Sequence, residues 1–219
     1  MPTMLVCEWE TPASKLEEKC IGDYCIRKKE VEPGTIWSMR EYDERPVFGY
    51  DEVVFACKAQ VVGLEEKGKV WMTNSPREYY SMHELAARSK GDVLVGGLGL
   101  GELANILANR RDIKSVEVVE KNKEVIDLVG KNVDRRVKIT HGDIFHRIKE
   151  LSKINACPST IILDIYRGDE DIEDVKMDYE YVKDMCPNSN VLVWNFGAEI
   201  ETEKAFDYLG IGRLFKYLY

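Results

Sequence analysis

The sequence predicts an α/β fold in which helices cover both faces of a parallel sheet, preceded by a small β-rich part. In the second part of the chain, five short apolar segments occur at 92–96, 115–119, 136–140, 160–165 and 190–196. Their starts lie 23, 21, 24 and 30 residues apart, which leaves room for one helix in each gap. Strands that are apolar on both faces and separated by helices are typical of a parallel sheet covered on both sides.

The first three gaps carry apolar residues at helical spacing. These residues are Leu103, Ile106 and Leu107, then Val125, Leu128 and Val129, then Ile144, Ile148 and Leu151. Positions three and four apart lie on one side of a helix, so each segment has an apolar stripe. We expect these stripes to pack against the sheet.

A helix is also predicted over 75–89, before the first of these strands. Ser75 can cap it, Pro76 suits its first turn, and Glu78 stands where a capping box requires it.

The preceding residues, 1–74, are interpreted as a small β-rich part, and 75–219 as the main domain. Segments 24–31, 35–40 and 52–62 are rich in β-branched and aromatic residues and are separated by turn residues. Residues 66–68 predict a hairpin turn into a strand at 69–72. Residues 1–20 favour no particular structure.

Composition and charge restrict the function. The chain has 219 residues and a net charge of −8, and a net −6 of this falls within 164–180. Acidic proteins bind nucleic acid poorly, because that affinity comes largely from Lys and Arg. No apolar run reaches the roughly 20 residues of a membrane helix, and no secretory signal is visible at the N-terminus. We therefore expect a cytoplasmic protein that binds neither nucleic acid nor membrane.

The six cysteines are scattered and form no Cys-x-x-Cys pair, and the three histidines do not stand near them at zinc-site spacing. Without a secretory signal, we expect reduced thiols and no metal site.

The residues that follow each predicted strand are the candidate ligand contacts, because ligands of such sheets bind outside the carboxyl ends of the strands. Gly97, Gly99 and Gly101 follow the first strand and directly precede a helix. They allow a ligand to approach the backbone at a helix N-terminus, although a plain turn would also use them. The dinucleotide fingerprint needs a glycine where Glu102 stands, which argues against NAD.

Three acids follow the next strands. Glu120 can accept both hydroxyls of a ribose, or it is a solvated acid near a helix start. Asp143 either contacts an adenine amine or only caps the next helix. Asp164 ends a buried apolar strand, where a carboxylate is costly unless it faces a cleft or a partner. The acidic run after it, from Asp169 on, either complements a helix dipole or attracts a cationic substrate.

Four segments together resemble the class I S-adenosylmethionine-dependent methyltransferases, and most closely their spermidine-synthase-like branch. They are 93–101 (VLVGGLGLG), Val119-Glu120, Gly142-Asp143 and Leu163-Asp164. The resemblance covers about 70–196. It implies a Rossmann-like methyltransferase fold. It also implies that Gly97, Gly99 and Gly101 hold the methionine part of S-adenosylmethionine, Glu120 its ribose, Asp143 its adenine, and Asp164 the reacting end.

Two departures weaken the polyamine branch of this resemblance. Polyamine synthases place Asp where Leu100 stands, and a second Asp where Arg167 stands. A diamine needs a counter-charge for each ammonium group, and Arg167 would repel it. Many methyltransferases also carry an acid at the position of Val95.

The chain ends with a predicted helix at 199–209 and a predicted strand at 213–218, and it has no substrate-recognising insertion after the fourth strand. This leaves the β-rich part and the 75–89 helix as the expected lid. The expected substrate contacts are Asn74, Tyr79, Tyr80 and Tyr166, with His83 as a second candidate base beside Asp164. Core packing is the alternative explanation for Tyr79 and Tyr80.

The sequence therefore favours an enzyme that transfers the methyl group of S-adenosylmethionine to a small acceptor. The net negative charge over 164–180 would also suit a cationic acceptor. Aminopropyl transfer from decarboxylated S-adenosylmethionine and a non-catalytic nucleotide-binding module are the alternatives. A homodimer is left open.

Overall fold

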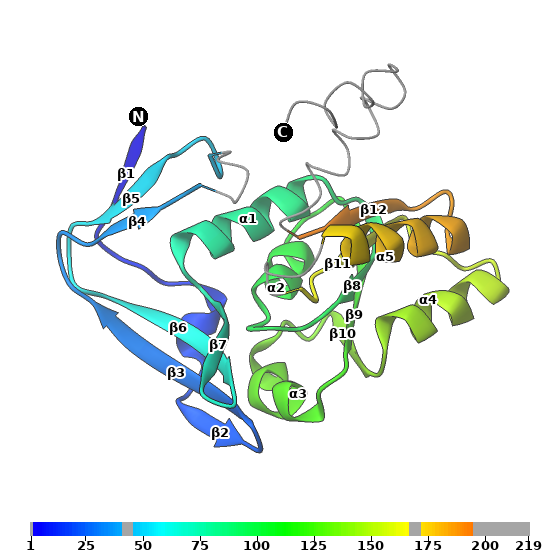
Figure 1. Ribbon diagram of the computed structural model, residues 1–219, viewed down its shortest axis with the longest axis horizontal. Coiled ribbons are helices and arrows are strands. Elements are labelled where there is room, and N and C mark those ends of the chain that lie inside the picture. Colours follow the sequence, from blue (N-terminus) through cyan, green and yellow to red (C-terminus); the bar gives the residue numbers. More distant parts are fainter. Residues whose placement is uncertain (1, 41–45, 167–171, 195–219) are drawn as a thin grey trace.

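In a computed structural model, a five-stranded sheet with all strands parallel forms the centre of the molecule (Figure 1). The structure describes residues 2–40, 46–166 and 172–194. The strand order is β10-β9-β8-β11-β12. The strands are β8 (Gly91–Gly96), β9 (Ile113–Glu120), β10 (Val137–His141), β11 (Thr160–Leu163) and β12 (Asn190–Val193). The predicted parallel α/β sheet is confirmed, and the arrangement is Rossmann-like.

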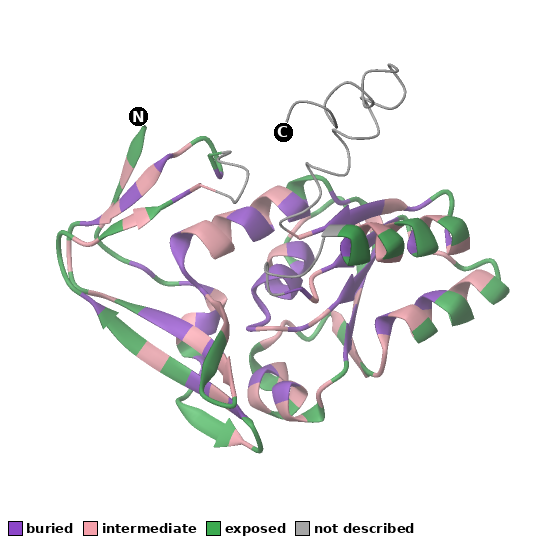
Figure 2. Cartoon of the chain, in the orientation of Figure 1, coloured by how far each residue is buried: buried purple, intermediate pink, exposed green. Residues whose placement is uncertain are grey.

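Five α-helices are described around this sheet, one before β8 and one in each gap. They are α1 (Pro76–Ala87), α2 (Glu102–Ala108), α3 (Lys123–Val129), α4 (Ile144–Lys153) and α5 (Ile172–Met185), and a 3₁₀ turn, η2 (Gly130–Asn132), follows α3. Successive strand residues enter different hydrophobic clusters. Val93 and Val95 pack with α1, α2 and α3, whereas Leu94 packs with α4 and α5. This alternation places three helices on one face and two on the other (Figures 1 and 2).

The described residues of the N-terminal part form two small sheets. One is antiparallel, with the order β2 (Lys19–Ile21), β3 (Tyr24–Val31), β6 (Ala59–Glu66) and β7 (Lys69–Thr73). The other has the order β1 (Thr3–Val6), β5 (Glu52–Phe55) and β4 (Ile36–Ser38), with β1 parallel to β5. A short 3₁₀ turn, η1 (Pro12–Lys15), lies between β1 and β2. The prediction of one strand over 52–62 is wrong, because that segment divides into β5 and β6 in different sheets.

The antiparallel sheet shares a core with the Rossmann-like part. Tyr24, Ile26, Val62 and Leu64 pack in the same cluster as the residues of α1, α2 and α3. A separate cluster that contains Phe55 packs the β1-β5-β4 sheet against Val31 and Val61 of the antiparallel sheet. The two parts of the chain are therefore joined by buried apolar contacts.

Helix α1 differs from its prediction in its cap. Pro76 opens the helix after Ser75, as predicted, but the Ser75 side chain makes no capping hydrogen bond. Glu78 instead accepts hydrogen bonds from the backbone N of Thr73 (2.6 Å) and from its hydroxyl (2.9 Å). The predicted capping box is therefore wrong, whereas the end of the helix at Ala87 agrees with the predicted end at about Ser89.

The expectation of reduced thiols is contradicted. The cysteines form three disulfides, Cys7–Cys57, Cys20–Cys25 and Cys157–Cys186. The pairs are 50, 5 and 29 residues apart in the chain, so the sequence spacing gave no sign of the pairing.

Within the described ranges, no helix combines the length and the apolar character that crossing a membrane would need. The predicted elements at 199–209 and 213–218 lie outside the described residues, as do Arg167 and the run from Asp169 to Asp171. The acids that follow, Glu173 and Asp174, stand in the first turn of α5, where they complement the helix dipole.

Candidate functional site

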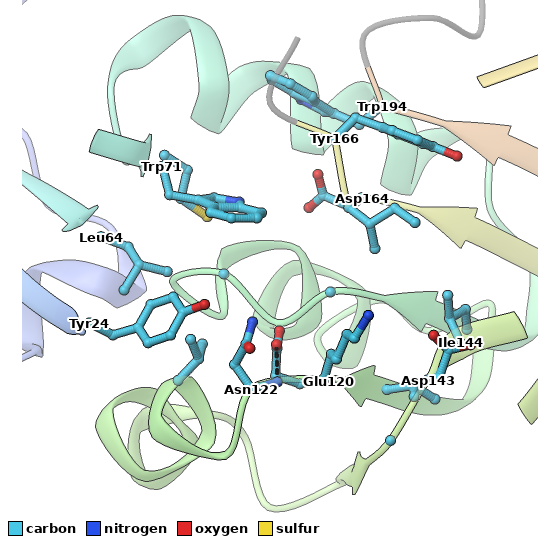
Figure 3. Close-up of a pocket in the computed structure, with 18 of the residues that line it drawn as sticks. Tyr24, Leu64, Trp71, Glu120, Asn122, Asp143, Ile144, Asp164, Tyr166 and Trp194 are labelled. Atoms are coloured by element: carbon cyan, nitrogen blue, oxygen red, sulfur yellow. Dashed lines mark hydrogen bonds between the residues drawn. The ribbon is translucent and has the colours of Figure 1, made fainter. Parts of the chain in front are cut away.

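A cavity of about 290 Å³ lies at the carboxyl ends of the central parallel strands. Its floor is formed by residues that follow β8, β9, β10 and β11, and its opposite wall comes from the antiparallel sheet and α1 (Figure 3). The volume is close to the lower end of the range of small-molecule sites, about 300–1,000 Å³. Its position is where the sequence placed the ligand.

The glycine loop after β8 adopts a backbone that favours glycine. The φ angles of Gly97, Gly99 and Gly101 are +93°, +51° and +77°. A Cβ atom on Gly97 would overlap the carbonyl oxygen of Asp164, and one on Gly99 would overlap the sulfur of Met72. Gly97 and Gly99 line the cavity and Gly101 does not.

Gly101 has a packing role. It precedes α2 directly, and a Cβ there would lie 3.0 Å from a methyl carbon of Val133 and 3.2 Å from one of Val129. The close approach of α2 to these two residues therefore explains the third glycine without a ligand.

Glu120 lies at the end of β9 with its carboxylate beside the glycine loop. One oxygen accepts a hydrogen bond from the backbone N of Leu98 (2.8 Å) and the other accepts one from the backbone N of Asn122 (2.7 Å). The side chain is buried, yet it lines the cavity. Because each carboxylate oxygen has two lone pairs, both oxygens keep an acceptor site for a ligand hydroxyl.

Asp143 caps α4. Its Oδ1 atom accepts hydrogen bonds from the backbone N atoms of Phe145 (2.9 Å) and His146 (3.1 Å). The predicted cap is confirmed, and because Asp143 also lines the cavity, its contact with an adenine amine stays a prediction. The cap occupies Oδ1, so Oδ2 is the atom that could serve a ligand.

Asp164 follows β11 and faces the cavity (Figure 3). Burial raises the pKa of its carboxyl to about 7, and the negative charges of Glu78 and Glu120 act in the same direction. Burial also raises the pKa of Glu78, whose hydrogen bonds to Thr73 oppose the shift. A carboxyl with a pKa near neutrality can exchange a proton at physiological pH.

The sequence predicted that the β-rich part and the 75–89 helix cover the site, but it did not identify the residues of the β-rich part that line the cavity. Tyr24 comes from β3, Leu64 from β6, and Trp71 and Met72 from β7. In Figure 3, Trp71 and Tyr24 stand on one side of the cavity, and Asp143 and Asp164 stand on the other. These contacts depend on how two sheets pack, which a local sequence pattern does not specify.

Two aromatic residues complete the wall beside Asp164. Tyr166, a predicted substrate contact, lines the cavity, and its hydroxyl donates to Asp178 (2.7 Å). Trp194 also lines the cavity, and its indole N–H donates to the hydroxyl of Ser81 (2.9 Å). These bonds tie both rings to helices α5 and α1.

Four other predicted site residues do not line the cavity. Asn74 is fully buried, and its side chain accepts a hydrogen bond from the backbone N of Val62 (2.6 Å) and donates one to the Thr11 hydroxyl (2.8 Å). The other three pack in an aromatic cluster around Trp9 and Phe48; they are Tyr79, Tyr80 and His83. Packing is therefore the role that the structure gives to Tyr79 and Tyr80.

The face of α1 explains this difference. Glu78 and Met82 stand four residues apart and line the cavity, whereas Tyr79, Tyr80 and His83 lie on another side of the helix. Burial lowers the pKa of the His83 imidazole, which keeps it neutral in this cluster.

The cavity has an acidic lining. Glu78, Glu120, Asp143 and Asp164 contribute carboxyl groups, and Lys121 is the one basic side chain among the described residues that line it. No group of three or more metal-ligating side chains occurs in the described ranges. Comparison with protein-family models and with curated protein sequences finds no match to this chain.

Proposed function

We propose that this protein binds S-adenosylmethionine in the cavity and transfers its methyl group to a small acceptor. The observation that carries the proposal is the meeting, in one cavity, of Gly97, Gly99, Glu120, Asp143 and Asp164. These residues lie at or directly after the carboxyl ends of four different strands, where the sequence predicts the ligand contacts.

The residues present fit the proposed cofactor. The open backbone at Gly97 and Gly99 leaves room for the methionine part, because a side chain there would overlap Asp164 or Met72. Glu120 would accept hydrogen bonds from the ribose hydroxyls, and Asp143 Oδ2 would accept one from the adenine amine. The bound cofactor supplies an electrophilic methyl group on a sulfonium.

The chain's own residues would align the acceptor and handle its proton. Asp164 lies at the carboxyl end of β11 beside Gly97, where the reacting end of the cofactor would lie. Above a pH of about 7 its carboxylate can take a proton from an amine or hydroxyl acceptor. Trp71, Tyr166 and Trp194 would exclude water around it. Methyl transfer to a good nucleophile needs mainly such alignment.

The acidic lining favours a second candidate, aminopropyl transfer from decarboxylated S-adenosylmethionine. Glu78 and Asp164 would repel the carboxylate of the intact cofactor, whereas the decarboxylated form has only positive charge at that end. Against this candidate, Leu100 stands where polyamine synthases have an acid, and its side chain is buried in the core. A binding module without catalysis is the third alternative.

Titration calorimetry with S-adenosylmethionine, its decarboxylated form and NAD tests these proposals. We expect binding of S-adenosylmethionine, weakened at least tenfold by Glu120→Ala, because the lost hydrogen bonds to a charged group contribute about 1.5–3 kcal/mol. Glu150→Ala, on the exposed side of α4, is the control and should bind as the unmodified chain does. Preference for the decarboxylated form would support aminopropyl transfer, and binding of none of the three would sink the proposal.

A further inference from the structure

A disulfide-closed hairpin supplies part of the cavity wall. In β2 and β3, Cys20 stands directly opposite Cys25, and Ile21 stands opposite Tyr24. Cys20 and Cys25 are bonded to each other. Tyr24, the residue next to Cys25, has a buried ring that lines the cavity. The disulfide is therefore one residue away from a ligand-facing side chain.

The same hairpin also contacts helix α3, which lies beside the cavity. Its turn residue Gly22 lies against Glu124 of α3, where a Cβ would be 3.3 Å from the Glu124 side chain. Helix α3 begins after Asn122 and contains Val125, and both residues line the cavity. Displacement of the hairpin would thus disturb the cavity through Tyr24 and through α3.

The hairpin depends on its cross-link more than the rest of the sheet does. Strand β2 has three residues and, among the described strands, stands at the edge of its sheet with β3 as its one partner. So short an edge strand is marginally stable by itself. The other strand of the hairpin, β3, has eight residues and is also paired with β6 along its length. Tyr24 and Cys25 stand at the start of β3, next to the turn. Opening the disulfide should therefore loosen β2, the turn and this end of β3, while the rest of β3 and the sheet remain.

The disulfide is open to reductants. Cys20 is exposed and Cys25 is half-buried. Arg27, which also pairs with Glu65 (3.7 Å), places a guanidinium N atom 3.7 Å from the sulfur of Cys25. A neighbouring cation stabilises a thiolate, so Cys25 is the better leaving group when a thiol attacks Cys20.

The other two disulfides lack this connection to the cavity. None of the four cysteines that form them lines it. Cys186 is fully buried in the cluster beneath α4 and α5, which protects its bond to Cys157. Cys7–Cys57 has one exposed partner and joins the segment after β1 to the β5–β6 connection. It serves as a matched control for an accessible disulfide.

We propose that Cys20–Cys25 is a thiol–disulfide switch that controls ligand binding in the cavity. A dithiol reductant converts the disulfide to two cysteine thiols and is itself oxidised to a disulfide, with two electrons and two protons transferred. In the oxidised form the hairpin holds Tyr24 in the cavity wall and Gly22 against α3. In the reduced form β2 separates from β3, the wall loosens, and ligand affinity falls.

Hydrogen exchange tests the structural part of this proposal without a ligand. Reduction with dithiothreitol should accelerate amide exchange in 19–26 and 122–129, with little change in the central strands β8 and β11. The Cys20→Ser/Cys25→Ser variant should show the fast exchange under both conditions. Cys7→Ser/Cys57→Ser should respond to reduction as the unmodified chain does. Equal exchange in the oxidised and reduced chain, or a response that survives in Cys20→Ser/Cys25→Ser, would overturn the proposal.

Calorimetry with S-adenosylmethionine then tests the effect on affinity, which rests on the proposed function. If reduction leaves the hairpin ordered in about one molecule in ten, the affinity falls about tenfold. Unchanged affinity despite faster exchange would overturn the switch. Absence of binding by the oxidised chain would count against the proposed function instead, and the exchange result would still decide whether the disulfide controls the hairpin.

The role of Arg27 has its own test. Arg27→Gln should slow the reduction of Cys20–Cys25 severalfold, because the departing Cys25 thiolate loses its neighbouring cation. The rate is measured by alkylating the free thiols at successive times and analysing the protein by mass spectrometry. Reduction of Cys7–Cys57 in the same variant should keep its rate. Equal rates for Cys20–Cys25 with and without Arg27 would remove Arg27 from the switch.

Discussion

At the scale of single residues, Asp164 is the position where charge and burial conflict most clearly. Its carboxyl faces a cavity that also contains Glu78 and Glu120, and all three groups carry negative charge when ionised. Burial and these charges together raise its pKa to about 7. The protein keeps a costly group at this position, which is common for a residue that moves a proton or holds a cation.

Asp164→Asn should spare cofactor binding and lower the rate of transfer by about 10²-fold or more, the usual contribution of a general base. In the unmodified chain the rate should rise with pH through about 7, as Asp164 loses its proton, and this rise should disappear in the variant. Rates from pH 5.5 to 8.5, measured once an acceptor is found, check both points. Asp127→Asn, at an exposed ion pair on α3, is the control. An unchanged pH profile would exclude Asp164 as the base.

At the scale of elements, the loop between β8 and α2 lies directly against the backbone that follows β11. Gly97 has a positive φ angle, and the carbonyl oxygen of Asp164 occupies the space that a Cβ atom of residue 97 would need. That oxygen belongs to the backbone after β11 and cannot rotate away as a side chain could. The loop and the end of β11 therefore keep a fixed separation.

Gly97→Ala should destabilise the protein more than Gly34→Ala does. The two glycines have similar φ angles, +93° and +85°, so both variants carry about 1–3 kcal/mol of backbone strain. Only Gly97 adds an overlap with backbone, because nothing lies within 4 Å of a Cβ at Gly34. Urea unfolding of both variants measures the difference, and S-adenosylmethionine binding should be lost only in Gly97→Ala. Equal stability of the two would contradict the close approach.

Asp143 performs two functions that a pair of substitutions can separate. Asp143→Ala removes the cap of α4 and should cost about 1 kcal/mol of stability, whereas Asp143→Ser retains a capping oxygen and should cost little. Both lose the carboxylate, so both should weaken S-adenosylmethionine binding if Oδ2 serves the adenine. Thermal unfolding and calorimetry give the two readouts. Normal binding by both variants would leave Asp143 with the capping role alone.

The elements also differ in how well the sequence predicted them. All five parallel strands begin within two residues of their predicted starts. The reason is clearest for β8, β11 and β12, which are mostly apolar and buried, as expected for strands covered by helices on both sides. The segment 52–62 was misinterpreted because two consecutive β-rich strands joined by residues 56–58 have the same composition as one long strand. Composition records the propensity for a strand but not the sheet in which it pairs.

At the scale of the whole molecule, the sequence predicts the cavity residues of the parallel sheet but not those of the antiparallel sheet. Glu120, Asp143 and Asp164 could be found because each follows a strand of one parallel sheet, and topology brings those ends together. Tyr24 and Trp71 could not, because they reach the cavity through the packing of a second sheet. The disulfides were missed for a related reason, since six cysteines allow 15 pairings and spacing does not choose among them.

Contact between the two parts of the chain also buries an acid that lies outside the cavity lining. Glu102, the first residue of α2, is 1% exposed. Its Oε1 atom accepts hydrogen bonds from the hydroxyl of Thr11 and from the backbone N of Ala13 (3.0 Å), whereas its Oε2 atom has no partner in the described part of the chain. Burial raises the pKa of this carboxyl to about 7 despite those two hydrogen bonds. The attachment of the N-terminal segment therefore includes a group that favours the protonated form.

This attachment should make the protein less stable as the pH rises. Between the ordinary pKa of 4.5 and the raised value of about 7, Glu102 is protonated when folded and ionised when unfolded, so each rise in pH favours unfolding. The full loss, on the order of 3 kcal/mol, is reached above pH 7. Glu102→Gln should remove this part of the pH dependence, as measured by urea unfolding at pH 5 and pH 8. Asp164, Glu78 and His83 titrate in both chains, so their contributions cancel in the comparison, and Glu150→Gln controls for the loss of an exposed acid. If Glu102→Gln loses as much stability between the two pH values as the unmodified chain, the buried carboxyl is ionised in the folded protein and a partner must reach Oε2.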